Sequence, residues 1–182
     1  IGFWGFTYTI SSTSYTDYLY MSTISSRRAS DNNYYTYGLD YFGNIITGTY
    51  TTSTGVWDIL DDSSSIISQY YVFTMNSSNS GITSGCYYQY SKSSQTWSSC
   101  YALSGVKIYG TPRSYRTLNE KSDYETINEK HLEILEVESR QRSSVLTDKE
   151  LQDFNRFQKL LQTFNSTDKV PIKTYLRSFR TK

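Results

Sequence analysis

Large apolar side chains alternate with small or polar ones through the first 110 positions of the chain. Between residues 4 and 10 every second side chain is apolar, namely Trp4, Phe6, Tyr8 and Ile10. This period of two predicts a strand with one buried face. Comparable runs cover residues 18–24, 35–41, 45–52, 56–60 and 68–75, and a further pair surrounds the two cysteines. Turn signals such as Phe42-Gly43-Asn44 separate them, so we expect about eight strands.

The spacing of these strands favours an antiparallel β-sandwich, with an up-and-down β-barrel as the alternative. Both folds are built from short strands that are joined by tight turns and apolar on one face. The alternation therefore leaves the choice between them open.

The pattern changes to a helical period after residue 111. Ser122-Asp-Tyr-Glu125 and Thr147-Asp-Lys-Glu150 both match the capping box, in which a hydroxyl and a carboxylate bond to free backbone amides at a helix start. Apolar residues follow each box at helical spacing, which predicts helices over about 123–140 and 148–164. The fold class expected is therefore α+β, with a two-helix extension after the β part.

The last residues return to an alternating pattern. Val170, Ile172, Thr174 and Leu176 share one side of a predicted terminal strand. A strand at the end of a chain can add to the edge of a sheet, either its own or that of a neighbouring molecule. We therefore treat these four residues as a candidate assembly strand.

Composition divides the chain at the same place as the pattern. Residues 1–110 carry four basic and six acidic side chains, whereas residues 111–182 carry fourteen basic and eleven acidic ones. We expect an antiparallel β domain over 1–110 and a charged helical extension with a strand-like tail over 111–182. The net charge of +1 gives no bias toward nucleic acid, and no apolar run is long enough to cross a bilayer.

Cys86 and Cys100 are the only cysteines in the chain. A hairpin turning over Lys92-Ser93-Ser94 would place them directly opposite each other, and Tyr88 opposite Ser98. This register predicts a disulfide, which indicates an oxidising compartment. We therefore expect an extracellular or cell-surface location, consistent with a chain that begins at Ile1 as a processed protein would. Two independent buried thiols are the alternative.

Tyrosine is the most unusual feature of the composition, with 19 residues. Tyrosine and tryptophan suit both sugar-binding faces and protein interfaces, because each ring is amphipathic and has few rotors. The candidates for a glycan or interface surface are Tyr34, Tyr35, Tyr37, Tyr41, Tyr87, Tyr88, Tyr90 and Trp97.

Other chemistry is sparsely represented. Asp58, Asp61 and Asp62 form the densest acidic group of the β part and are a weak calcium candidate, since calcium needs six or more oxygen ligands. Asn76 and Asn165 begin glycosylation sequons. His131 is the only histidine and lies on the apolar stripe of a predicted helix, so a structural role is expected. No catalytic constellation is identifiable, and neither an enzyme nor a cofactor is expected.

Gly2-Phe3-Trp4 at the start of the first predicted strand resembles the Gly-x-Trp signature of lipocalins and avidins. The resemblance covers these three residues and the coarse order of the elements. It implies an up-and-down barrel, which in lipocalins is followed by a helix, and it supports the alternative fold.

Two functions fit these features. The first is a secreted or cell-surface structural or adhesive subunit that assembles with copies of itself or with other protein subunits. The second is an extracellular β module that binds a glycan or a small ligand through its aromatic side chains. The first is the function that we expect, and the second is its alternative.

Overall fold

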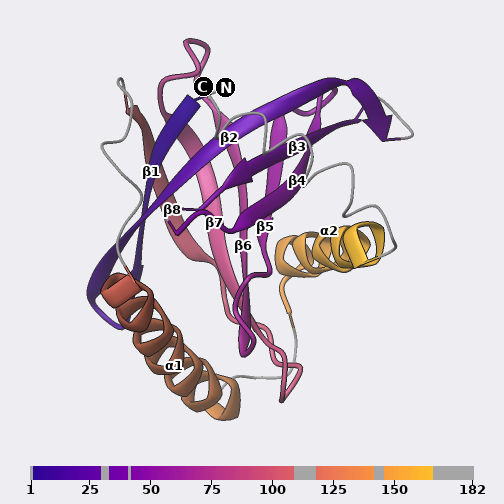
Figure 1. The fold of residues 1–182 in the computed structure, drawn as a ribbon. Helices are drawn as coiled ribbons and strands as arrows, with labels where there is room; N and C mark the ends of the chain where they lie inside the picture. The colour runs from indigo at the N-terminus through magenta and orange to yellow at the C-terminus, as the bar shows by residue number, and fades with distance from the viewer. Residues whose placement is uncertain (1, 30–32, 41, 109–117, 142–145, 166–182) are drawn as a thin grey trace.

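The structure is a computed structural model that describes residues 2–29, 33–40, 42–108, 118–141 and 146–165, with the backbone alone for 22–29, 118–125 and 164–165. Its described part contains eight antiparallel strands in one closed barrel, followed by two helices (Figure 1). The strands are β1 (Gly2–Ile10), β2 (Thr13–Ala29), β3 (Asn33–Leu39), β4 (Ile45–Thr51), β5 (Val56–Asp61), β6 (Ile67–Met75), β7 (Ile82–Ser91) and β8 (Tyr101–Ile108). The helices are α1 (Leu118–Gln141) and α2 (Asp148–Asn165).

The prediction of eight antiparallel strands is confirmed. These strands close into one barrel, so the structure has the alternative fold and not the expected β-sandwich. Each strand pairs with its neighbours in the chain, and β1 also pairs with β8, from Phe3 opposite Ile108 to Tyr8 opposite Leu103. Strand β2 is 17 residues long; its first part pairs with β1 and its second part with β3. A single long strand shared in this way lets one sheet curve round and close.

Two glycines allow a close approach of neighbouring strands on the inner wall. A Cβ atom at Gly38 would lie 1.8 Å from the backbone oxygen of Tyr20, and one at Gly48 would lie 1.8 Å from that of Asp58. Any larger residue would push the strands apart at these points. The two glycines therefore favour the strong curvature of β3 and β4.

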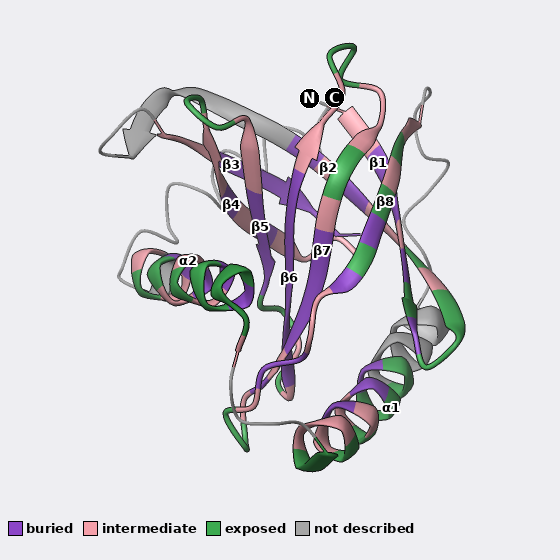
Figure 2. Ribbon diagram, turned by 180° about the vertical axis from the view of Figure 1, so that it is seen from behind, coloured by how far each residue is buried: buried purple, intermediate pink, exposed green. Residues whose placement is uncertain are grey.

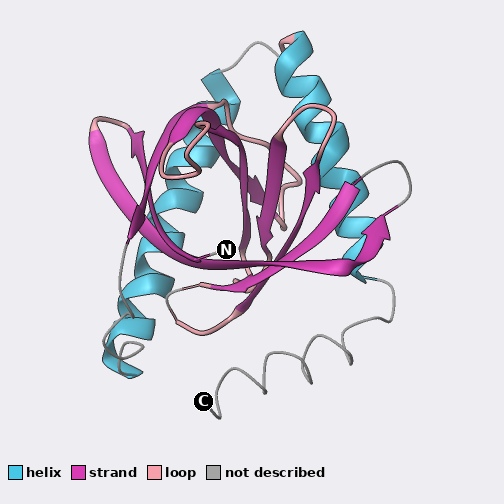
Figure 3. Ribbon diagram, turned by 90° about the horizontal axis from the view of Figure 1, so that it is seen from above, coloured by secondary structure: helices cyan, strands magenta, loops and turns pink. Residues whose placement is uncertain are grey.

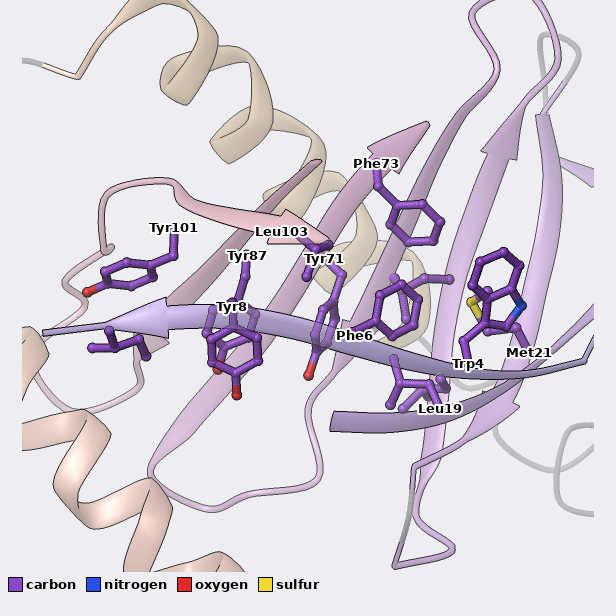
Figure 4. Packing of buried hydrophobic residues seen from close by; sticks show 13 residues of the cluster. Trp4, Phe6, Tyr8, Leu19, Met21, Tyr71, Phe73, Tyr87, Tyr101 and Leu103 are labelled. Carbon is purple, nitrogen blue, oxygen red and sulfur yellow. The ribbon is translucent and has the colours of Figure 1, made fainter. Parts of the chain in front are cut away.

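Aromatic side chains fill the inside of the barrel. Figure 4 shows Trp4, Phe6 and Tyr8 of β1 facing Tyr71 of β6 and Tyr87 of β7. The Tyr8 and Tyr87 rings stack with their centroids 3.7 Å apart. An eight-stranded barrel is about wide enough for its own side chains to fill. The alternating positions predicted from the sequence thus form a packed core inside the barrel.

Helix α2 lies on the outer wall beside β5 (Figures 1 and 2), and its apolar side chains cluster with residues of β5, β6 and β7. Its fully buried Phe157 lies against Tyr70, with ring centroids 5.6 Å apart, and against Trp97, at 4.8 Å. The predicted capping box is present at its start: Thr147 Oγ1 accepts a hydrogen bond from the Glu150 amide, and Glu150 accepts one from the Thr147 amide. The start predicted for this helix is therefore confirmed.

Helix α1 packs at the end of the barrel where β1 turns into β2. Its His131 is fully buried, and the imidazole meets the Tyr15 ring edge-on, with centroids 4.5 Å apart. Glu138 accepts a hydrogen bond from the Tyr101 hydroxyl. The helix already begins at Leu118, so the predicted start at Ser122 is wrong and that motif lies inside the helix.

The hairpin of β7 and β8 differs from the predicted register. Cys86 pairs with Ala102 in the ladder, and a separate bridge joins Tyr90 to Trp97. The reason is that residues 98–100 form no regular strand: the Ser98 hydroxyl accepts a hydrogen bond from the Gln89 amide and replaces part of the ladder.

Some predictions fall on residues outside the described ranges. They are Tyr41, the boundary at 110/111, and the terminal strand with Val170, Ile172, Thr174 and Leu176. Neither described helix has the length and apolar character needed to span a membrane. Viewed from above, the two helices flank the barrel on the outside (Figure 3).

Candidate functional site

A pocket of about 330 Å³ lies between helix α2 and the outer face of strands β3, β4 and β5. These elements lie side by side in Figure 1. The lining residues are Asn33, Tyr35, Thr49, Thr51, Asp58, Arg156, Lys159, Leu160 and Thr163. The barrel supplies the first five and the helix supplies the last four.

The floor of the pocket consists of outward-facing residues from three paired strands. Tyr35 of β3 is directly opposite Thr49 of β4, which in turn is opposite Asp58 of β5. The neighbouring row pairs Asn33 with Thr51. Because side chains alternate between the two faces of a strand, these residues point away from the barrel core. The floor therefore combines one aromatic ring with hydroxyl, amide and carboxylate groups.

Asp58 is the acidic group of the pocket, and both of its carboxylate oxygens are engaged. The Tyr70 hydroxyl donates to Oδ1, and the Thr49 hydroxyl donates to Oδ2 at 3.4 Å. The side chain is 3% exposed. Burial raises the pKa of Asp58, whereas the hydrogen bond from Tyr70 and the charge of Arg156 act to lower it. Each oxygen can accept a second hydrogen bond, so the group remains an acceptor for a ligand.

The wall of the pocket is one face of α2. Leu160 is buried against the barrel, and residues three and four positions away therefore lie beside the same strands. These neighbours are Arg156 and Thr163, with Lys159 next to Leu160. Within the described part of the chain, neither Arg156 nor Lys159 has a carboxylate within 4.0 Å. The wall thus brings two positive charges to a floor that carries one carboxylate.

Asn33 adds an unsatisfied polar atom to the pocket. Its side-chain oxygen is buried and has no hydrogen-bond partner among the described residues. Unpartnered buried polar atoms are uncommon in native proteins and call for an explanation. A ligand that donates to this amide would supply one.

Most of the aromatic residues predicted for a binding face serve in packing. Tyr87 lies inside the barrel, whereas Tyr88, Tyr90 and Trp97 pack beneath α2. The Tyr88 hydroxyl donates to Asp153 of that helix at 2.7 Å. Tyr87, Tyr88 and Trp97 are thus buried, and Tyr90 is half-buried.

The tyrosines of β3 differ in how far they are buried. Tyr37 is buried beside Leu39 on the outer wall, and Tyr34 is half-buried. Of the predicted aromatic residues, Tyr35 is the one that lines the pocket.

The three carboxylates considered for calcium do not come together. Asp58 and Asp61 lie on opposite faces of β5. Asp61 is two residues after Ile59, so it shares the face of Ile59, which points into the barrel core. Asp61 accepts a hydrogen bond from the Ser63 amide, and Asp62 forms a salt bridge of 2.8 Å with Lys92. The described residues hold no group of three acidic, histidine or cysteine side chains fit for a metal.

Cys86 and Cys100 form a disulfide, as the sequence predicts. Cys86 is buried beneath α2, where the Lys149 amine donates to its sulfur at 3.2 Å. The bond joins β7 to the segment before β8 and supports the platform on which α2 rests.

The two sequons differ in position. Asn76 begins the turn between β6 and β7, and its side-chain oxygen accepts hydrogen bonds from the Ser80 amide and the Ser78 hydroxyl. Asn165 is the last residue of α2, where the backbone alone is described.

A second group of polar side chains lies inside the barrel. The Tyr71 hydroxyl donates to Asp17 at 2.7 Å, and burial raises the pKa of Asp17 to about 6. Asp40 follows β3 and accepts hydrogen bonds from the Phe42 and Asn44 amides. Burial, assisted by the charge of Asp61, raises the pKa of Asp40 to about 7. Both carboxyl groups are held by protein donors, so we assign them to the structure of the barrel.

Sequence reasoning missed Arg156, Lys159 and Thr163 of the pocket wall. In the sequence they are polar positions of an amphipathic helix. One signal in the sequence marks them: residues 156, 159, 160 and 163 are three or four positions apart and share one face of the helix. On that face polar side chains surround the apolar Leu160.

Comparisons with protein-family models, with curated proteins and with solved structures find no match to this chain.

Proposed function

We propose that this protein is an extracellular binding module that holds a small polyhydroxylated ligand, such as the end of a glycan, in the pocket beside α2. The observation that carries the proposal is the lining of that pocket. A volume of about 330 Å³ is at the lower end of the range for small-molecule sites and suits a ligand of monosaccharide size.

The types of lining group support a sugar as the ligand. Sugar hydroxyls both donate and accept hydrogen bonds, and the pocket offers acceptors at Asp58 and Asn33 beside the hydroxyls of Thr49 and Thr51. The ring of Tyr35 supplies an apolar surface on which the C–H face of a sugar can stack. A purely apolar ligand would leave these polar groups without partners, which is costly in a buried site.

The outside of the barrel is a better location than its inside. Thirteen buried residues form one cluster within the barrel, and their rings pack against one another. A ligand there would have to displace packed aromatic side chains. At the α2 pocket the floor belongs to a rigid sheet, and a ligand can enter without disrupting the core.

The disulfide supports the extracellular part of the proposal. Disulfides persist in oxidising compartments and are rare in the cytosol. Secretion would also allow a glycan on Asn76, which begins the turn between β6 and β7.

A glycan array, followed by calorimetry with the best ligand, tests the proposal. Tyr35→Ala should weaken binding by about five- to a hundredfold if a sugar gains on this ring what a base gains on an aromatic side chain, about 1–3 kcal/mol. Tyr18→Ala is the matched control, since Tyr18 stacks on Phe3 on the opposite part of the outer wall. Equal binding by both variants, or no glycan bound at all, would exclude this pocket as a glycan site.

Assembly with other copies remains a second candidate, favoured by one surface feature. Val106 is 62% exposed and lies in a row with Gly5 and Tyr18 across β8, β1 and β2. Self-association through this row predicts a dimer in light scattering that Val106→Asp dissociates. A wild-type chain that stays monomeric up to millimolar concentration would rule the candidate out.

A further inference from the structure

The charges of the α2 pocket narrow the class of ligand that the proposed function leaves open. This inference rests on that function and adds the ionic character of the ligand. The pocket wall carries two cations, Arg156 and Lys159, which differ in the acids that surround them.

Arg156 is balanced by acidic groups of the protein. Its charge lowers the pKa of Asp58 on the floor and that of Asp153 one turn earlier on the same helix. Both carboxylates are buried and held by tyrosine hydroxyls, Tyr70 for Asp58 and Tyr88 for Asp153. The guanidinium therefore lies in the field of two fixed acids, and its charge is compensated.

Lys159 has no such compensation from the acids that the structure describes. It follows Arg156 by three residues, which places it about 4.5 Å farther along the helix axis. Among the described residues its ammonium group lacks both an ion pair and a hydrogen-bonded acceptor. Lys159 is thus an exposed cation at the pocket that forms no ion pair with any described acid.

The pocket consequently has two kinds of subsite. Asp58, with free acceptor capacity on both oxygens, suits the hydroxyl groups of a ligand. Lys159 suits a negative charge, and a lysine presents a single point charge rather than the bidentate fork of an arginine. The single positive charge of one lysine matches a group of charge −1, such as a carboxylate or a sulfate ester, better than a phosphate monoester of about −1.5 to −2.

We propose that the pocket selects a sugar that bears one negative charge, with Lys159 as the partner of the anion and Asp58 as the acceptor of a sugar hydroxyl. Uronic acids carry that charge as a carboxylate, and O-sulfated sugars carry it as a sulfate ester. Both present the same combination of hydroxyl groups and a monoanion.

Calorimetric titration of the full chain tests the inference with four probes: glucose, glucuronic acid, glucose 6-sulfate and glucose 6-phosphate. At least one monoanionic sugar should bind about tenfold more tightly than glucose, with an affinity that falls as salt is added. Comparison of the glucuronic acid and sulfate arms tells which anion the site prefers. A preference for the phosphate would overturn the match to a single charge.

Variants at Lys159 separate the anion subsite from the rest of the pocket. Lys159→Gln should reduce the affinity for the charged sugar to about that for glucose, whereas Lys159→Arg should retain most of the preference. Lys130→Gln removes the same charge from an exposed position on α1 and should have no effect.

Two results would contradict the inference, and they differ in what they say of the proposed function. If glucose or another neutral glycan binds as tightly as the charged sugars and Lys159→Gln changes nothing, the site is neutral and the proposed function stands. If no sugar binds and the glycan array is empty, the proposed function fails together with this inference.

Discussion

Removal of the Phe157 ring should test how α2 is held on the barrel. Phe157 is fully buried, and its ring centroid lies 4.8 Å from that of Trp97, 5.1 Å from that of Tyr90 and 5.6 Å from that of Tyr70. Truncation of a buried phenylalanine to alanine costs about 3–5 kcal/mol, as lost burial and as the cavity left behind. We expect Phe157→Ala to lower the unfolding free energy by that amount.

Urea unfolding followed by tryptophan fluorescence and by far-ultraviolet circular dichroism measures the loss. Trp97 is in contact with Phe157, so its emission should report any loosening of α2 before the barrel unfolds. If α2 leaves first, the fluorescence transition will precede the dichroism transition of the sheet.

Leu151→Ala is the matched control on the same helix, because Leu151 is 48% exposed. Its cost should stay within about 0.5 kcal/mol. A Phe157→Ala variant that is no less stable than Leu151→Ala would refute the packing of α2 on β5 to β7. Without that packing, α2 could not form the wall of the proposed pocket.

Three further changes have defined outcomes. Replacement of Cys86 and Cys100 by alanine should lower the unfolding free energy by about 3 kcal/mol, measured by urea titration, because the bond closes a loop of about 15 residues. Thr147→Ala should cost about 1 kcal/mol in the same assay, whereas Thr147→Ser should cost little, since serine keeps the cap. Asp40→Asn should flatten the pH dependence of stability. The pKa of Asp40 is raised to about 7, so protonation favours the folded state, and this contribution is lost as pH rises through 7. The wild type should therefore gain up to about 4 kcal/mol relative to Asp40→Asn as pH falls from 7.5 to 4, and parallel curves would contradict the burial of that carboxyl group.

The strands could be predicted from the sequence because each depends on local alternation. Trp4, Phe6, Tyr8 and Ile10 all face the barrel core, as their period of two indicates. Barrel closure could not be predicted in the same way. The pairing of β1 with β8 joins distant parts of the chain, and an inward-facing residue has the same pattern in a sandwich and in a barrel.

The helix starts show a similar contrast. The capping box at Thr147 marks the beginning of α2, where the carboxylate of Glu150 returns to the Thr147 amide. The equal motif at Ser122 lies inside α1, since a helix can extend past a capping sequence when the preceding residues also adopt helical geometry. A motif of four residues therefore marks a helix start only when the residues before it are not themselves helical.

The pocket was the least predictable feature. Tyr35 was among the candidate aromatic residues, but nothing in the sequence distinguishes it from Tyr87, which lies inside the barrel. The difference arises from register and from the position of α2 on the outer wall. Lys159 and Asp58 meet at one pocket only because the helix packs across β5, a contact between segments far apart in the chain.

The seam between β1 and β8 has a consequence for how the chain reaches its native state. Strand β1 is the first to be synthesised, yet one of its two ladders can form only after β8 has been made. Until then its large aromatic side chains lack part of their final surroundings. Such distant pairing raises the contact order, and a higher contact order is associated with slower folding. During synthesis, the nascent first strand is therefore the segment most in need of protection from aggregation.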